Sequence, residues 1–447
     1  MRWMGYFGLG SVALALTSLS AAAQQGTKLP DMIACPEAVA KIATCFTAKL
    51  DTGAYLLAAL PKDWNGNLIV FAHGGPAIVP PTAKSSNGDL AKYAVGVKLG
   101  YAFVASSYRK EGYGVQMAAA DTDDARKFFI EHIGKPKRTL LWGASYGGLV
   151  GAKLLETYVK NSNGGVNYDG AFFNSGAVAG SLANYEFRAD LRAVYQYYCK
   201  NLPRPAEAQY PLWMGMPAES KMTLKELSAT VDECTGVTKQ ANERTALQKQ
   251  NLANIINVVR IPESMLVRHM QAATFVFRDI AQGLALGKSA FSNMNVRYQG
   301  SSDDAALNKG VARFDADPAA LAALKADGYP VGMLPIPVVS IHSMNDPQAA
   351  VEAQYEYRER AKASGNGDRL VQAYGDEKVH TGQSDPELAA ALNGLTAWIE
   401  KRTKPSPQSI ASSCMALRAT YDGPCRYHPD YEPKPLSTRF ARSASAN

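Results

Sequence analysis

The chain has 447 residues, and its 47 lysines and arginines against 40 aspartates and glutamates give a formal net charge of +7. This mild excess of positive charge is spread along the chain without a basic block, which argues against a nucleic-acid partner. No segment offers about 18 consecutive apolar residues, so we expect no membrane span. A chain of this length exceeds what one simple core usually supports, which predicts a main domain with a second element.

Residues 1–23 have the features of a signal peptide for export. Arg2 lies near the start, an apolar stretch follows around residues 12–16, and three alanines at 21–23 form a small-residue cleavage site. The sequence therefore predicts a secreted or periplasmic protein.

Six cysteines lie beyond this segment. An even number of cysteines in an exported chain predicts three disulfides. Their grouping into neighbours suggests the pairs Cys35–Cys45, Cys199–Cys234 and Cys414–Cys425. Sequence alone leaves the connectivity open. No Cys-x-x-Cys motif or cysteine and histidine cluster indicates a metal site.

Apolar runs and helical patterns alternate in the first part of the chain. Candidate strands cover residues 54–60, 67–73, 101–107, 138–142 and 168–174. Candidate helices lie between them, at 91–99, at 118–133 and after residue 145. Such alternation is typical of a parallel sheet that is covered by helices on both faces. We therefore predict the α/β class with a mostly parallel, doubly wound sheet.

The alternation stops between residues 181 and 334. Helical patterns without a good strand occupy this stretch, at 185–199, 224–234, 242–259, 262–284 and 318–325. The α/β rhythm then returns with strands at 336–342 and 369–374 and with helices at 348–363 and 386–401. Because the helical stretch is inserted between two strands of one sheet, we expect it to form a lid or cap over the ends of the strands.

A glycine-rich turn around a serine follows the strand at 138–142. Residues 143–147 read Gly-Ala-Ser-Tyr-Gly, and Gly148 comes next. A serine that projects from a sharp strand-to-helix turn has a strained backbone, and glycines around it leave the necessary space. The start of the helix also directs free N–H groups toward the position where negative charge develops. This is the pattern of a nucleophile elbow, which makes Ser145 the predicted nucleophile.

A serine hydroxyl needs a base to take its proton and a carboxylate to orient that base. His380 is the best candidate among six histidines, because it follows the last predicted strand and precedes the final helix of the sheet domain. Asp346, just beyond the strand that ends at His342, is the best candidate for the acid. Asp376 and Glu377 are alternatives that lie next to the histidine in sequence.

The order Ser145, Asp346, His380 along the chain is the order found in α/β-hydrolases. The chain resembles a secreted α/β-hydrolase with a large helical cap, over residues 54–178 and 335–402. This resemblance implies the α/β-hydrolase fold, with a discontinuous catalytic domain at 24–180 and 335–447 and a cap at 181–334. It implies no metal and no organic cofactor.

The same resemblance implies an oxyanion hole. One donor would be the backbone N–H of Tyr146, and the second would come from the loop at 73–76, with Gly75 as the first choice and Gly74 as the alternative. Aromatic and methionine-rich segments of the cap indicate a bulky, partly apolar substrate. The candidate substrate contacts are Tyr146, Trp213, Met214 and Met270.

Two hydrolytic activities remain open. The motifs at 73–76, 108–114 and 143–148 are similar to those of prolyl-oligopeptidase-type peptidases and of prolyl iminopeptidases, which implies a secreted peptidase as one alternative. However, no propeller domain precedes the catalytic part, and the cap has no acidic cluster to hold a substrate α-amino group. These features favour the hydrolysis of carboxylic esters. The substrate would be a small-molecule, oligomeric or polymer-derived ester.

Tannase-like and feruloyl-esterase-like enzymes are also exported and capped. They commonly have a disulfide between the nucleophile motif and the histidine loop, and Ala144 and Thr381 lack this bridge. An α/β-hydrolase fold can also serve as a binding module without activity, but all three positions of the triad hold competent residues here. The sequence leaves the oligomeric state open.

Overall fold

The computed structural model describes residue 1 and residues 29–440. The predicted signal peptide therefore lies outside the described residues, except for its first residue. Among the residues described, no helix combines the length and the apolar character that crossing a membrane requires.

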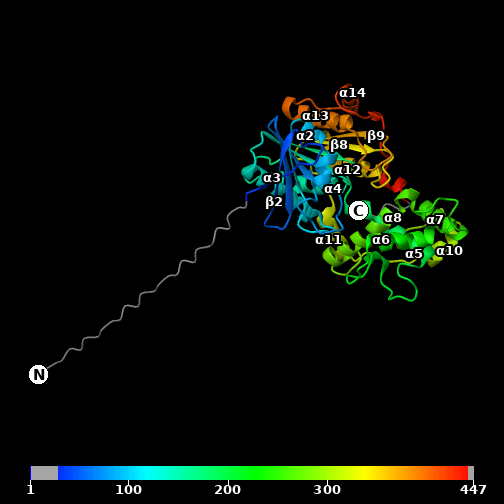
Figure 1. Cartoon of the computed structure of the whole chain (residues 1–447). Coiled ribbons are helices and arrows are strands. Elements are labelled where there is room, and N and C mark those ends of the chain that lie inside the picture. The colour runs from blue at the N-terminus through cyan, green and yellow to red at the C-terminus, as the bar shows by residue number, and fades with distance from the viewer. Residues whose placement is uncertain (2–28, 441–447) are drawn as a thin grey trace.

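A nine-stranded sheet forms the centre of the protein, with the strand order β1-β2-β3-β5-β4-β6-β7-β8-β9 (Figure 1). Its strands are β1 (Asp31–Ile33), β2 (Ala43–Lys49), β3 (Tyr55–Pro61), β4 (Asn67–Ala72), β5 (Ala102–Ser106), β6 (Arg138–Ala144), β7 (Gly170–Asn174), β8 (Val338–Ser343) and β9 (Leu370–Gly375). The pairs β1–β2, β2–β3 and β3–β5 are antiparallel. All pairs from β5 through β4 to β9 are parallel.

Helices cover both faces of this sheet, which explains why central strands such as β4 are buried along their whole length. One face packs against α3 (Val115–His132), α4 (Tyr146–Thr157) and α12 (Glu352–Ala363). The other face packs against α1 (Asn87–Lys92), α2 (Val95–Lys98), α13 (Asp385–Lys401) and α14 (Pro407–Leu417). The doubly wound sheet and its strand order are those of the α/β-hydrolase fold, as predicted.

All seven predicted strands are present, with bounds that differ by one or two residues. The edge strands β1 and β2 were not predicted. Only three of the seven residues of β2 are buried, and its sequence does not alternate regularly between apolar and polar residues, which explains why the pattern was weak.

The inserted stretch is helical, as expected, and every residue from 181 to 334 is described. It contains α5 (Ser181–Cys199), α6 (Leu224–Thr235), α7 (Ala246–Val259), α8 (Leu266–Gln271), α9 (Phe277–Asp279), α10 (Asp304–Gly310) and α11 (Pro318–Gly328). Two π-helical turns, Ala272–Val276 and Ile280–Leu284, flank α9, and short 3-10 helices form at Leu212–Met214 and Glu263–Met265. Figure 1 shows α5, α6, α7, α8 and α10 gathered in a lobe beside the sheet.

This lobe has an apolar core of its own, but the insertion does not form one separate unit. Residues such as Leu191, Val231 and Ile255 pack together inside the lobe. In contrast, Phe277 and Leu324 belong to the core that covers the α3 and α4 face of the sheet. The later part of the insertion is therefore integrated into the sheet domain, and the boundaries at 181 and 334 remain a proposal.

Three disulfides join the cysteines in the pairing that their grouping suggests. Cys35–Cys45 fixes the segment before β2, Cys199–Cys234 joins α5 to α6, and Cys414–Cys425 joins α14 to the loop after it. Each bridge restricts the unfolded chain, which typically contributes about 2 to 4 kcal/mol to stability.

Candidate active site

Ser145 lies at the sharp turn between β6 and α4, with a backbone φ of 56°. A positive φ is unfavourable for a residue with a side chain, and the surrounding packing keeps it. A Cβ atom at Gly143 would lie 2.3 Å from the carbonyl oxygen of Gly147, and a Cβ atom at Gly147 would lie 1.9 Å from the carbonyl oxygen of Ala72. The turn can therefore form only with glycines at these positions.

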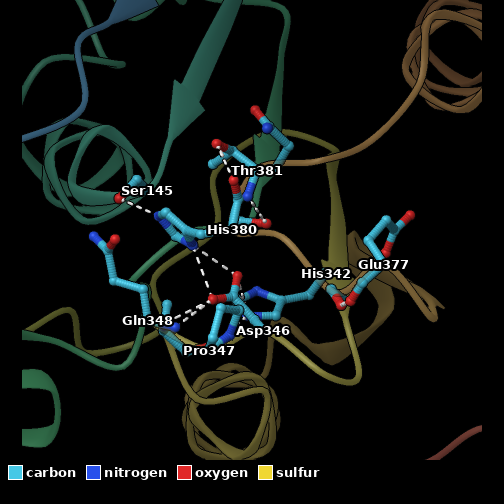
Figure 2. A network of polar contacts seen from close by, with 12 residues as sticks. Ser145, His342, Asp346, Pro347, Gln348, Glu377, His380 and Thr381 are labelled. Atoms are coloured by element: carbon cyan, nitrogen blue, oxygen red, sulfur yellow. Dashed lines mark hydrogen bonds and ion pairs between the residues drawn. The ribbon is translucent and has the colours of Figure 1, made fainter. Parts of the chain in front are cut away.

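The three residues predicted as a triad lie together in the structure (Figure 2). The Nε2 atom of His380 is 2.7 Å from the Oγ atom of Ser145. Its Nδ1 atom is 2.7 and 2.9 Å from the two carboxylate oxygens of Asp346. The serine follows β6, the aspartate follows β8 and the histidine follows β9. Because these strands are parallel, their carboxyl ends meet at one edge of the sheet and bring the three side chains together.

The environment of Asp346 keeps its carboxylate charged. Burial alone would raise its pKa, but the charge and the hydrogen bonds of His380 lower the pKa to about 2. The backbone N–H groups of Gln348 and Ala349 also donate to one carboxylate oxygen, each at 2.9 Å. A carboxylate held in this way orients the imidazole with its proton on Nδ1, so that Nε2 can accept from the serine.

The other candidates for the acid do not reach His380. Asp376 is 3.3 Å from the ring of His428, and Glu377 is 3.8 Å from Arg426. Asp376 and Glu377 lie on the same loop as His380, and their carboxylates contact other residues instead of its ring.

His342 is buried beneath the acid and supports its loop. Its Nε2 atom is 3.0 Å from the carbonyl oxygen of Ala349, and its Nδ1 atom is 3.1 Å from the amide nitrogen of Gln354. Burial lowers the pKa of His342, so the ring is neutral and donates only from Nε2. This histidine is a packed strand residue, as its sequence position indicated.

The loop after β4 lies against the elbow. A Cβ atom at Gly74 would be 3.7 Å from the Cβ atom of Ser145, so the loop backbone approaches the nucleophile closely. Two contacts of His73 fix this loop. The Nδ1 atom of His73 is 2.5 Å from the carboxylate of Asp89, and the hydroxyl of Tyr108 donates to the backbone carbonyl oxygen of His73 at 2.7 Å. Gly74 and Gly75 both remain candidates for the second oxyanion donor, with Tyr146 at the start of α4 for the first.

A pocket with a cavity volume of about 40 Å³ lies beside this loop, between the sheet domain and the helical insertion. Gly75 and Pro76 line one side, α5 and α8 line the other, and Gln348 of the acid loop lies between them. Figure 2 shows the side chain of Gln348 on the same side of His380 as Ser145. Gly75 and Gln348 therefore place the pocket next to the two loops that flank the triad, although none of the three triad residues lines it.

The residues predicted to contact substrate do not line this pocket. Tyr146 is buried, and its hydroxyl accepts from the backbone N–H of Gly114 at 3.2 Å. Met270 is completely buried in the cap core, so this prediction is not supported. It faces inward from α8 and packs with the apolar residues of the lobe. Trp213 and Met214 are half-buried on a short 3-10 helix and remain predictions.

Sequence reasoning missed the polar residues of the pocket. These are Arg188, Arg268, Gln271 and Gln348. An arginine or glutamine within a helical pattern is usually part of a solvated face, so nothing in the sequence distinguished them. In the described part of the chain, no group of three or more histidine, cysteine, aspartate or glutamate residues could hold a metal ion.

Two buried carboxyl groups, Glu377 of the His380 loop and Glu387 of α13, share one arginine. Glu377 and Glu387 are only 2% and 0% exposed, and Arg426 lies 2.8 Å from Glu387 and 3.8 Å from Glu377. Burial and the nearby charge of Glu387 raise the pKa of Glu377 to about 7. Arg426 is therefore the cationic neighbour of both carboxyl groups, and ionising Glu377 and Glu387 at the same time is unfavourable.

Replacing Glu377 with glutamine is expected to stabilise the protein at pH 8. The raised pKa gives the wild type a stability that is complete below the ordinary value of 4.5 and is lost as pH rises through about 7. Glutamine removes this loss, so the free energy of unfolding should exceed that of the wild type by roughly 1 to 3 kcal/mol at pH 8. Urea unfolding at pH 5 and pH 8 measures the difference, which should shrink at pH 5. Asp376→Asn, on the same loop but half-exposed, is the control. An equal effect at both pH values would contradict this account.

Among the comparisons with known proteins, only solved structures match the chain. No family model and no curated protein matches the chain. Among solved structures, it is similar to feruloyl esterase B from Aspergillus oryzae, with 11% identity over 81% of each chain and a TM-score of 0.42. It is also similar to an esterase from Aspergillus oryzae, with 15% identity over 81% of each chain and a TM-score of 0.41. Candida antarctica lipase A has 12% identity over 89% of this chain and 94% of its own, with a TM-score of 0.46.

These similarities are too distant to carry the activity of those proteins to this chain. The fold is the α/β-hydrolase fold, and Ser145, His380 and Asp346 lie together at the carboxyl edge of its sheet.

Proposed function

We propose that this protein is a secreted serine hydrolase that cleaves carboxylic esters through an acyl-enzyme intermediate. The observation that carries the proposal is the continuous hydrogen-bonded arrangement of Ser145, His380 and Asp346. Export is supported by the signal-like residues 1–23 and by the three disulfides, which form and persist in oxidising compartments.

The proposed reaction has two halves. In the first, Nε2 of His380 takes the proton of Ser145 as Oγ attacks the ester carbonyl carbon. The resulting oxyanion would accept hydrogen bonds from the N–H of Tyr146 and from that of Gly75 or Gly74. The tetrahedral intermediate then collapses, the histidine gives its proton to the leaving alcohol oxygen, and the acyl group remains on the serine. In the second half, a water molecule repeats the attack and releases the acid.

The charge of the pocket favours esters over aminoacyl substrates. An aminopeptidase needs acidic side chains to bind the positively charged α-amino group of its substrate. The pocket beside the elbow has no aspartate or glutamate among its lining residues, and two arginines contribute to it. The environment is therefore unfavourable for a cationic substrate terminus. Trp213 and Met214 remain candidates for contacts with a bulky, aromatic or oligomer-derived part of the ester.

Matched substrates test the proposed activity. Short and long 4-nitrophenyl esters, a feruloyl ester and a polyester oligomer would be compared with alanine and proline 4-nitroanilides, with Ser145→Ala as the background. We expect hydrolysis of esters with idle anilides, and covalent labelling of Ser145 by a fluorophosphonate, located by mass spectrometry. Faster turnover of the anilides would support the peptidase instead. Equal ester hydrolysis by Ser145→Ala would exclude the proposed mechanism.

A further inference from the structure

A buried arginine lines the pocket beside the loop at Gly75. Arg188 of α5 is only 7% exposed. Its guanidinium donates to Nδ1 of His269 at 3.2 Å and to the carbonyl oxygens of Gln348, at 3.3 Å, and of Asn184. None of these acceptors is charged. Among residues 29–440, no aspartate or glutamate forms an ion pair with Arg188.

A second arginine adds to the positive charge of the same pocket. Arg268 of α8 lines its rim and donates to the side-chain oxygen of Gln271 at 3.0 Å, again a neutral partner. Burial lowers the pKa of Arg188 to about 10, and the charge of Arg268 adds to this effect. Two guanidinium groups therefore line one small pocket.

Such an arrangement is costly unless something compensates it. A buried charge normally has a partner of opposite charge, because its desolvation is otherwise not offset. Neutral acceptors within residues 29–440 occupy three of the five N–H donors of Arg188, and no described residue accepts from the other two. Arg192, one turn further along α5, is also buried without an acid among the described residues, but it donates to the carbonyl oxygen of Leu202 inside the lobe and does not line this pocket.

The rest of the pocket suits an apolar group that ends in an anion. Ile78, Val276 and the ring of Tyr185 provide apolar walls, and the arginines lie on the cap side. Gly75, which lines the pocket, lies on the loop that contacts the elbow. A substrate with its ester at Ser145 would thus extend along these walls toward the two guanidinium groups.

On the basis of the proposed function, we propose that the substrate is an anionic ester, whose pocket-bound part carries a carboxylate that Arg188 and Arg268 bind. A half-ester of a dicarboxylic acid has this chemistry, as does the ester of a hydroxy acid. The carboxylate supplies the negative charge that the pocket lacks, and the planar guanidinium groups provide the donors that carboxylates prefer.

Two substrate pairs test the inference and locate the carboxylate. For the acyl side, we would compare the mono-4-nitrophenyl ester of adipic acid with its neutral methyl-capped form. For the alcohol side, we would compare 4-carboxyphenyl butanoate with 4-carbamoylphenyl butanoate. We expect kcat/KM to favour the anionic member at least about ten-fold in one of the two pairs, as a charged hydrogen bond typically contributes.

Arginine variants show whether the pocket causes this preference. In Arg268→Gln the ratio of anionic to neutral kcat/KM should fall about ten-fold, mainly through KM. Arg188→Lys, which keeps the charge but loses the planar donors, should give a smaller fall. Arg278→Gln is the matched control, because Arg278 is a cap arginine that already pairs with Asp279 at 2.8 Å. Equal rates within both pairs, or a ratio that Arg268→Gln leaves unchanged, would overturn the inference.

Binding to an inactive variant separates this inference from the proposed activity. Monomethyl adipate and dimethyl adipate would be titrated into Ser145→Ala, with and without Arg268→Gln. Tighter binding of the anionic ligand that depends on Arg268 supports the inference even if no ester is hydrolysed, in which case only the proposed activity fails. Hydrolysis of neutral esters together with equal binding of both ligands would contradict the inference and leave the activity standing.

Discussion

Replacing Asp346 with asparagine is expected to lower kcat for ester hydrolysis about ten-thousand-fold in a folded protein. The carboxylate accepts from Nδ1 of His380 at 2.7 Å and so keeps Nε2 free of a proton. An asparagine amide can donate to Nδ1, which would move the proton to Nε2, where it blocks acceptance from Ser145. Steady-state kinetics on a 4-nitrophenyl ester measures the loss, and circular dichroism checks the fold.

Asp376→Asn is the matched control for this change. Asp376 lies on the loop of His380, but its carboxylate is half-exposed and contacts His428 rather than the triad. We expect this variant to keep the activity of the wild type within about two-fold, as is usual for an exposed site. A large loss in Asp376→Asn together with an active Asp346→Asn would mean that the acid has been assigned to the wrong residue.

Gly147→Ala is expected to reduce the free energy of unfolding by roughly 3 kcal/mol or more and to abolish activity. The new methyl group would lie 1.9 Å from the carbonyl oxygen of Ala72, which is backbone in the centre of the sheet and cannot move without displacing β4. Relieving this contact shifts the elbow and the loop at Gly74 together. Urea unfolding and ester kinetics on the same preparation measure both effects.

Gly88→Ala provides the comparison for this substitution. Gly88 lies in the helix α1, and no atom comes within 4 Å of the position that its Cβ would occupy. Alanine should leave stability unchanged or slightly increase it, because glycine is unfavourable inside a helix. A Gly147→Ala variant with the stability of Gly88→Ala would show that the elbow does not need its glycine.

The sequence predicted the sheet and the triad because both depend on local patterns. Apolar runs identify buried strands, and the glycines around Ser145 are required by one turn. The meeting of Asp346 and His380 follows from parallel strands, since residues just after such strands share one edge of the sheet. These features need no knowledge of how distant helices pack.

The pocket could not be predicted in the same way. Arg188 and Arg268 come from two helices of the cap, and their positions depend on how these helices pack against the loop at Gly75. The methionine-rich pattern around Met270 indicated a binding surface, but the same pattern also fills a helical core, which is what it does here. Residues of a core and residues of a pocket have similar composition, and only tertiary packing distinguishes them.

The helical insertion is hydrogen-bonded to the loop that carries Asp346. Nε2 of His269 lies 3.3 Å from the carbonyl oxygen of Pro347, and Arg188 donates to that of Gln348, so α8 and α5 both contact the residues just after Asp346. Lifting the cap as a rigid body would break these bonds and disturb the alignment of the acid. We therefore expect a site of fixed size that selects substrates by their dimensions, and that needs no lipid–water interface to open it.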